Sequence, residues 1–318
     1  MRKNAYASVA ITLFVLMALP TLSLLYAIPT VNLVHGHPMI PAPLGSKPAE
    51  AAKSNKICYL NPLLGQCWAS YNWAGYALTG PGGTLLAPGS VTYVEASWTV
   101  PALVGHNLGG QTGSACEDVD GAYFDVATWI GIDGWFGSST VEQTGTSSDC
   151  AWGTAQYYAW YEFFPGPSNT VFPVSAGDKI FASVTYDPIG LTFTTYIHDI
   201  TAKLSYTEVV AASTVVGAVE GSAEWITEAA AFATPVGFQI LSLSDFGTFT
   251  FTGAYAGIDG YSGTISSLPK LLPGTVQDQF SLMINFNFPL TPGIKAQPLA
   301  LAAAGSSFTV DFVTAGPV

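Results

Sequence analysis

One glutamine and several carboxylates and tryptophans are the residues of this chain whose types and spacing could carry chemistry. Every second side chain of a strand points to the same face of its sheet. This period groups three pairs on three segments: Trp160 with Glu162, Trp129 with Asp133, and Glu224 with Glu228. On a fourth segment Gln143 shares a face with Val141 and Gly145. Indoles supply flat apolar contact and carboxylates supply proton transfer, so these faces indicate a ligand groove. The alternative is that the tryptophans fill a core and the carboxylates point outward at its edges.

Several common reaction classes lack their motifs in this sequence. It contains no G-x-S-x-G, no Walker or dinucleotide-binding glycine loop, and no H-E-x-x-H. Only His106 and His198 follow residue 57, and we interpret both as structural, which leaves few candidates for a Ser-His-Asp or Cys-His mechanism. The absence of C-x-x-C argues against a thiolate zinc site, and we expect neither a metal nor a cofactor.

The elements that must position these residues are short strands. Of the 318 residues 13% are aromatic and only 9% are charged, and glycine and proline punctuate runs of alternating polarity. We predict strands over residues 91–100, 123–132, 154–164, 179–186, 191–198, 248–255, 280–288 and 307–313. Many short strands between turns indicate an all-β fold, an antiparallel β-sandwich that forms one main domain.

Two further patterns bear on the fold. Segment 222–234 fits either a strand or a helix because alanines fill its second half, and we take its first half as a strand. The tetrapeptide Gly-Ile-Asp-Gly occurs at 131–134 and at 257–260 with different flanks. We therefore interpret it as shared turn chemistry rather than as a repeat.

Charge is divided unevenly along the chain. Five of the nine basic residues precede Cys58, and four lysines against twenty acidic residues follow it. Such an acidic body makes nucleic acid an unsuitable partner. In acid its carboxylates are protonated and few basic groups remain, so repulsion between positive charges stays small and work in acid is physically plausible. Any acidic secreted protein would share this composition.

The N-terminal region has the features of a targeting segment followed by a leader. Arg2 and Lys3 precede an uncharged run, so we assign 1–28 as a signal peptide, or as a retained membrane anchor because the run is long enough to span a bilayer. Residues 29–69 are rich in proline and lack an apolar period, so we assign them as a propeptide or linker. Residues 70–318 then form the sandwich domain, and we expect a monomer that is secreted or anchored to the outer face of the cell membrane.

The four cysteines are an even number in an exported chain, which permits disulfides. Cys58 with Cys67 and Cys116 with Cys150 is the simplest of the three pairings.

Eight short motifs, in order, resemble those of the glutamic peptidases, also called eqolisins. They begin at Asn72, Trp98, Trp129, Gln143, Ala159, Ala176, Ala223 and Asp245, and read N-W-A-G, W-T-V-P, W-I-G-I-D-G, Q-T-G, A-W-Y-E, A-G-D, A-E-W-I-T-E and D-F-G. The resemblance covers roughly residues 70–313. It implies two long, curved antiparallel sheets with a concave substrate groove, similar to concanavalin-like lectins, and hydrolysis of polypeptides in acid.

The resemblance also assigns roles to individual residues. The glutamine of Q-T-G and the last glutamate of A-E-W-I-T-E are the family's catalytic pair, which implies that Gln143 and Glu228 carry the reaction with an activated water. Groove residues of the family fall on Trp73, Trp129, Asp133, Trp160 and Glu162. Glu224, the first glutamate of its motif, is interpreted as a neighbour of the acid.

The chain departs from the family pattern at three places near these residues. Ser147 stands where an aspartate usually follows the glutamine by four positions, with Asp149 two residues later. Tyr158 replaces the aspartate before A-W-Y-E, and Phe163 and Phe164 replace a Trp-Tyr pair. These changes concern substrate subsites and supporting hydrogen bonds.

Two other functions use the same residue types. A lectin-like binding protein could stack sugars on Trp129 and Trp160 without cleaving a bond. A glycosidase could pair Glu228 with Glu224 or Glu162, because two carboxylates suffice for that chemistry. Neither of them requires Gln143, which favours the peptidase.

Overall fold

The computed structural model describes residues 33–34, 66–104, 123–151, 154–234, 237–284 and 294–315, with the backbone alone for 33–34, 66, 123, 151 and 232–239. The chain divides into two compact units, Met1–Val31 and Asn32–Val318, and all described residues belong to the second. Within these ranges no helix is long and apolar enough to cross a membrane. The predicted signal peptide or anchor lies outside them.

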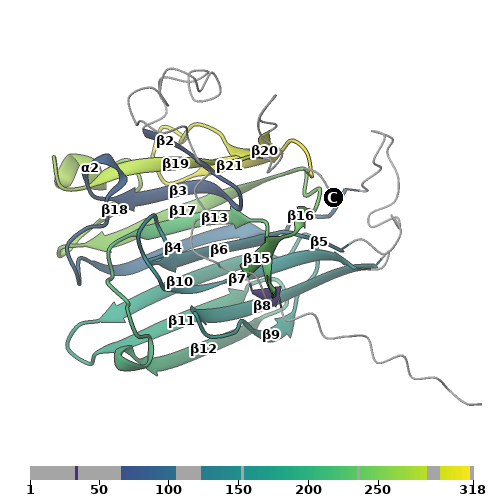
Figure 1. Ribbon diagram of the computed structural model, residues 1–318, viewed down its shortest axis with the longest axis horizontal. Coiled ribbons are helices and arrows are strands. Elements are labelled where there is room, and N and C mark those ends of the chain that lie inside the picture. Colours follow the sequence, from purple (N-terminus) through teal and green to yellow (C-terminus); the bar gives the residue numbers. More distant parts are fainter. Residues whose placement is uncertain are drawn as a thin grey trace, which may run out of the picture. The chain divides into compact units, whose positions relative to one another are not determined.

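One layer of the second unit is a broad sheet that carries the candidate residues (Figure 1). Its strands, in spatial order, are β9 (Asn169–Pro173), β8 (Thr154–Phe164), β7 (Val141–Ala151), β6 (Ala127–Ile132), β13 (Ala223–Glu228), β3 (Trp73–Thr79), β19 (Gln277–Ile284) and β2 (Gln66–Ser70). Neighbours are antiparallel except β19 and β2. The short strand β5 (Tyr123–Asp125) pairs with the end of β7, and β16 (Ser242–Leu243) lies parallel to β5.

The second layer runs through β12 (Leu204–Ala211), β11 (Thr192–Asp199), β10 (Lys179–Asp187), β4 (Val91–Thr99), β17 (Thr248–Ile258) and β18 (Tyr261–Thr264). Strand β17 belongs to both layers, because its first half pairs with β21 (Phe308–Phe312), which continues the first layer through β20 (Ile294–Pro298). Among the described residues the α-helical part is a single turn, α2 (Leu268–Leu271). The all-β prediction is therefore confirmed.

Indole hydrogen bonds join the two layers across the main core. Trp98 of β4 donates Nε1–H to Thr146 Oγ1 of β7 at 3.0 Å. Trp225 of β13 donates to the backbone carbonyl of Glu95 of β4 at 2.9 Å. Aliphatic and aromatic side chains of both layers surround these contacts and are buried between the layers. The inner face of the broad sheet is thus the core face, which leaves its other face for the candidate site.

Several local predictions can be compared with the structure. Strand β8 has the predicted bounds, and the predicted strand over 123–132 divides into β5 and β6. Segment 222–234 is strand in both halves, β13 and β14 (Ala231–Thr234). Both Asp-Gly pairs of the repeated tetrapeptide have positive φ, 66° and 102° at Asp133 and Gly134, and 50° and 80° at Asp259 and Gly260. The tetrapeptide is therefore shared turn chemistry, as predicted.

Strands of the second unit extend into the segment 29–69, which the sequence predicts to be a propeptide or linker. Strand β2 begins at Gln66 and pairs with β19, so the sheet includes residues that the sequence analysis placed in the leader. Further upstream, β1 (Leu33–Val34) pairs antiparallel with β14, which also pairs with β15 (Gly237–Ile240). Neither Cys67 nor Cys150 is a free thiol. Cys58 and Cys116 lie outside the described residues, so the two cysteine pairings remain predictions.

Candidate active site

The candidate residues lie on the outer face of the broad sheet, in rows that cross β8, β7, β6 and β13. Figure 1 shows these strands side by side. The first row is Glu162, Gln143, Gly131 and Glu224; the second is Trp160, Gly145, Trp129 and Ile226; the third is Tyr158, Ser147, Ala127 and Glu228, continued by Trp73 of β3. Strand register and period two therefore place Gln143, Glu162 and Glu228 on one face. All three side chains are buried.

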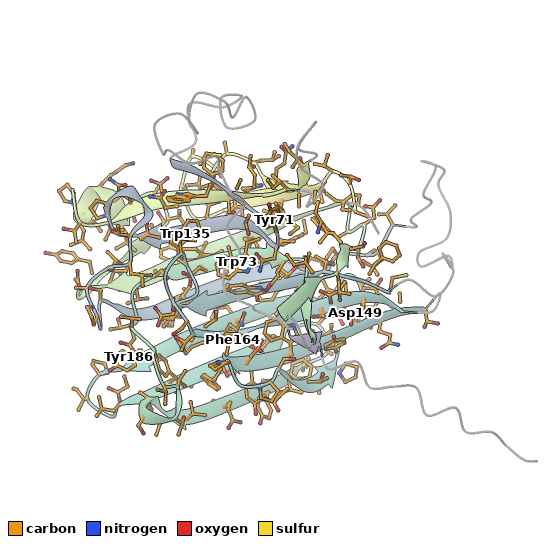
Figure 2. The ribbon with its side chains drawn as sticks, in the orientation of Figure 1. Tyr71, Trp73, Trp135, Asp149, Phe164 and Tyr186 are labelled. Atoms are coloured by element: carbon orange, nitrogen blue, oxygen red, sulfur yellow. The ribbon has the colours of Figure 1, made fainter. Side chains whose placement is uncertain are left out.

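A second apolar cluster supports this face, separate from the core between the layers. Its largest members are four buried indoles, those of Trp73, Trp129, Trp135 and Trp160. The rings of Trp73 and Trp129 meet edge to face with centroids 5.0 Å apart, and the centroids of Trp73 and Trp135 lie 6.5 Å apart. Trp73 and Trp135 are labelled in Figure 2. A Cβ atom at Gly145 would lie 2.5 Å from the Cβ of Trp129, so glycine is needed there for the indole to pack. The tryptophans thus form a rigid apolar support.

The carboxyl group of Glu228 is held at both oxygens. Trp129 donates Nε1–H to Oε2 at 2.8 Å, and Asn72 donates Nδ2–H to Oε1 at 3.1 Å. Ser70 in turn donates its hydroxyl to Asn72 Oδ1 at 2.8 Å, which orients the amide. Two fixed donors keep the carboxyl in one orientation. The sequence analysis did not assign Asn72 a role, although it begins the N-W-A-G motif.

Gln143 contacts the second carboxyl group of the face. Its Nε2–H donates to Glu162 Oε2 at 3.3 Å. Burial raises the pKa of Glu162 well above its ordinary value, and the charge of Glu228 raises it further. Glu162 therefore favours its neutral form, and Gln143, Glu162 and Glu228 form one electrostatically connected group. Within the described residues no cluster of histidine, cysteine, aspartate and glutamate is arranged to hold a metal.

Asp133 occupies a different setting from the other candidate groove residues. It lies beyond the end of β6 at a φ of 66°, and its side chain is fully buried. Its carboxylate accepts three backbone N–H groups, those of Val219, Glu220 and Gly221, at 2.7, 2.8 and 2.8 Å. Asp133 thus follows the last residue of β6 in a left-handed turn, and its carboxylate bonds to the loop that precedes β13. These bonds give it the role of anchoring the loop that leads into β13.

Replacing Asp133 by alanine is expected to destabilise the fold by about 3 kcal/mol or more, because three buried N–H groups lose a charged acceptor. Asp133→Asn retains one acceptor oxygen, so this variant should lose less stability than Asp133→Ala. Chemical denaturation of both variants measures the difference. If Asp133 instead binds substrate directly, both variants would keep wild-type stability and raise KM.

Among the described residues, several buried carboxyl groups lie in an environment that opposes ionisation, four of them strongly. Burial raises the pKa of Asp125, Glu142, Glu162 and Glu224 well above the ordinary range. Glu142 points from β7 into the core face, opposite to Gln143, and the negative charge of Asp133 raises its pKa further. These groups hold protons in the folded chain at pH values where the unfolded chain has released them.

The fold is therefore expected to be more stable in acid than at neutral pH. Because the folded chain binds more protons, the stability these groups contribute is present below the ordinary carboxyl pKa of about 4 and decreases as pH rises through their raised folded-state values. We expect the Tm at pH 3 to exceed that at pH 7 by at least about 5 °C. Glu142→Gln should narrow this difference, because the amide mimics the protonated acid. Thermal unfolding across pH tests this, and a Tm that increases with pH would contradict it.

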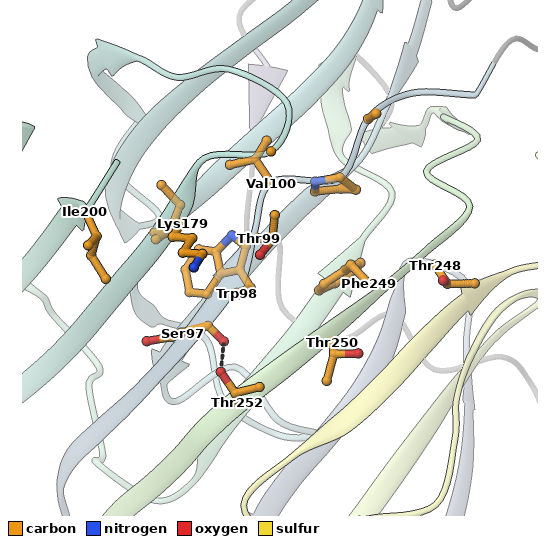
Figure 3. Close-up of a pocket in the computed structure, with 14 residues that line it drawn as sticks. Ser97, Trp98, Thr99, Val100, Lys179, Ile200, Thr248, Phe249, Thr250 and Thr252 are labelled. Atoms are coloured by element: carbon orange, nitrogen blue, oxygen red, sulfur yellow. Dashed lines mark hydrogen bonds between the residues drawn. The ribbon is translucent and has the colours of Figure 1, made fainter. Parts of the chain in front are cut away.

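A cavity of about 650 Å³ opens on the second layer, along β4, β10 and β17 (Figure 3). Ser97, Trp98, Lys179, Phe249 and Thr252 contribute to its lining. It contains none of the candidate residues. The candidate site is thus defined by side-chain geometry and chemistry, not by the open volume.

Comparison with known proteins agrees with the fold. The family model of the peptidase A4 family matches residues 71–272. Aspergillopepsin-2 of Aspergillus niger is 29% identical over 219 residues, covering 66% of this chain and 73% of that protein. The structure of scytalido-glutamic peptidase with a transition-state analogue inhibitor superposes with a TM-score of 0.57 at 20% identity, covering 76% of this chain and 98% of that one. SCP-B, a member of the eqolisin family in complex with the tripeptide Ala-Ile-His, gives a TM-score of 0.55 at 20% identity with the same coverage of each chain.

The family model covers more than half of this chain, and the fold agrees with it. This chain therefore belongs to the peptidase A4 family, the glutamic peptidases, and is a peptidase.

Proposed function

We propose that this chain is a secreted endopeptidase that works in acid and hydrolyses peptide bonds with Gln143, Glu228 and an activated water. The observation that carries the proposal is the fixed carboxyl of Glu228, held by Trp129 and Asn72 on the face that also carries Gln143. Peptide hydrolysis needs a proton-transfer group and a donor for the developing oxyanion. One carboxyl and one amide satisfy both needs.

In this mechanism the two side chains have separate tasks. Glu228 exchanges protons with the attacking water and with the leaving amine. Gln143 does not titrate, so its N–H group can donate to the oxyanion at any pH, while its carbonyl oxygen helps to orient the water. The bond from Gln143 to Glu162 pre-orients the amide before substrate arrives. The buried indoles exclude bulk water and strengthen these interactions.

The buried carboxyl groups support activity in acid. Glu162 lies in the first row with Gln143, and its raised pKa keeps it neutral beside Glu228 as long as the medium is acidic. Ionisation of Glu162 at higher pH would add a negative charge next to the oxyanion and oppose the reaction.

The two alternative functions receive less support. A lectin-like protein would have no task for the carboxyl group of Glu228, which Trp129 and Asn72 hold in place. The indole nitrogen of Trp129 is also committed to Glu228. A glycosidase would leave Gln143 without a task, whereas the peptidase uses it.

The direct test is digestion of a denatured protein by the purified full chain at about pH 3, with a pepstatin-like inhibitor present to suppress aspartic peptidases. We expect internal cleavage that resists the inhibitor. Glu228→Gln prepared in parallel is the control for contaminating peptidases. Absence of cleavage by the chain, or equal cleavage by the variant, would refute the proposal.

The leader is expected to restrain the enzyme until acid releases it. Residues 29–69 carry three lysines and two histidines ahead of an acidic body, and β1 within the leader pairs with β14, three residues after Glu228. Protonation of the body's carboxylates weakens their attraction for these bases. Incubation of the full chain at about pH 3 should therefore remove the leader and raise activity, as followed by N-terminal sequencing. Equal activity at neutral pH with the leader intact would show that it is only a spacer.

A further inference from the structure

A second pair of carboxyl groups lies one row beyond Glu228. Asp125 ends β5 and Asp149 belongs to β7. Phe124 is opposite Cys150, and Val126 and Ser148 exchange both of their backbone hydrogen bonds, so Asp125 and Asp149 face each other across the two strands. Figure 2 shows Asp149 toward the end of the sheet where β5 pairs with β7.

Both carboxyl groups are buried and hydrogen-bonded. Asp125 and Asp149 are 0% and 1% exposed, and the strand register makes their carboxyl groups neighbours. Tyr158 donates its hydroxyl to Asp149 Oδ2 at 2.7 Å. The backbone N–H of Ala230 donates to Asp125 Oδ1 at 3.1 Å. Two carboxyl groups can share a direct hydrogen bond only when one of them carries a proton.

The bond to Ala230 holds the chain where it leaves the Glu228 motif. Ala229 donates its N–H to the carbonyl of Asn72 at 2.9 Å, and Ala230 accepts the N–H of Leu241 at 2.8 Å. Asn72 also donates its side-chain amide to Glu228. Three hydrogen bonds therefore fix the two residues after Glu228. The bond to Asp125 is the one among these three whose acceptor can titrate.

The surroundings would make a proton shared by the two carboxyl groups sensitive to pH. Burial raises the pKa of Asp125 well above its ordinary value, and the negative charges of Asp149 and Glu228 raise it further. Tyr158 faces the pair from β8, and β16 contributes no ionisable side chain. Within the part of the chain that the structure describes, Lys295 donates its Nζ–H to the carbonyl of Leu241 at 3.4 Å, and Leu241 is the residue whose N–H bonds to Ala230. Loss of the shared proton would thus leave two adjacent buried carboxylates beside Glu228.

We propose that Asp125, Asp149 and Tyr158 form a proton-sharing clamp that positions Glu228, and that release of the shared proton loosens the clamp and ends activity on the alkaline side. This inference rests on the proposed catalytic role of Glu228. The three are positioning residues, because they act through the backbone at Ala230.

The clamp coincides with two departures of this chain from the family pattern. Ser147 and Tyr158 replace the two usual aspartates, and they are opposite each other on β7 and β8. Tyr158 reaches past Ser147 to Asp149. The carboxyl pair of this chain, Asp125 and Asp149, therefore lies one row beyond the row of Ser147 and Tyr158, where the family usually has its two aspartates.

The test uses amide variants that keep the bonds without the shared proton. In Asp149→Asn the amide N–H can donate to Asp125 while the amide oxygen accepts from Tyr158; Asp125→Asn is the reciprocal change. We expect both variants of the full chain to retain peptide cleavage within about threefold at pH 3 and to shift the alkaline midpoint of kcat upward by about one pH unit or more. Asp125→Ala should lower kcat at least about tenfold with little change in KM, because the turn is released.

The direction of the shift separates the clamp from the simpler explanation. If the protonation of Glu228 alone sets the alkaline limb, neutralising a nearby carboxylate leaves the midpoint unchanged or lowers it. Either of those results would overturn the proposal. Asp259→Asn is the matched control, because Asp259 is an exposed carboxylate in a turn at a φ of 50° that asparagine tolerates. It should leave the profile unchanged.

A second measurement does not depend on catalysis. With ¹⁵N-alanine labelling, the amide shift of Ala230, assigned from its absence in Ala230→Gly, should titrate in the wild-type chain and lose that step in Asp149→Asn. If the chain cleaves no peptide but this titration occurs, the clamp exists and the proposed function fails. If cleavage occurs and the Ala230 amide shift shows no such step, the clamp fails alone.

Discussion

Glu228→Gln is expected to reduce peptide cleavage by at least about 10² to 10⁴, the range for loss of a general acid–base group. The amide keeps nearly the same shape and can still accept the N–H of Trp129 or Asn72, so the variant should fold. The measurement is kcat and KM on a peptide substrate in acid, with the folded state checked by circular dichroism. The effect should fall on kcat, because the group acts in the transition state.

Glu224→Gln provides the matched control for this prediction. Glu224 lies on the same strand and the same face as Glu228, and its side chain is equally buried. Burial already raises its pKa well above the ordinary range, so replacing it by the neutral amide changes little in acid. Glu224→Gln should therefore reduce peptide cleavage much less than Glu228→Gln does. Full activity in Glu228→Gln with loss in Glu224→Gln would move the catalytic role to the first glutamate.

Gln143→Ala is expected to lower kcat by about 10² to 10³, the cost of removing one oxyanion donor. The strand should persist, because Gln143 lies within β7 between two paired strands and its backbone bonds are unaffected. Gln143→Glu is a sharper companion, since it keeps the length of the side chain and replaces the donor by a group that titrates. Its activity should decline as pH rises and the new carboxyl group ionises.

The double variant decides whether the two residues act together. Gln143→Ala combined with Glu228→Gln should cost less than the product of the single effects, because both serve one transition state. Fully multiplicative losses would indicate two independent contributions. Steady-state kinetics of the four proteins closes this cycle.

The fold class and the strand faces that carry the candidate residues could be predicted from local sequence patterns. Alternation of period two is a local property of an extended backbone, so Gln143, Glu162 and Glu228 could be placed on faces before any pairing was known. The bounds of β8 and the Asp-Gly turns were also predictable, because strand propensity and positive φ are local. Segment 222–234 remained ambiguous, since alanine favours helix locally while its strand partners come from distant parts of the chain.

Which of these faces lie together, and which groups hold each side chain, depends on long-range contacts that appear only in the folded chain. Asn72 reaches Glu228 across 156 residues, and Asp125 meets Asp149 through a pairing that depends on the register of β5 with β7. Asp133 followed the period of β6 in the sequence, but a left-handed turn directs its carboxylate to the loop at 219–221. Contacts of this kind depend on the register of paired strands and on the order in which the chain connects them, and no local sequence pattern encodes either. Burial, and with it the raised pKa values of the carboxyl groups, follows from the same long-range packing.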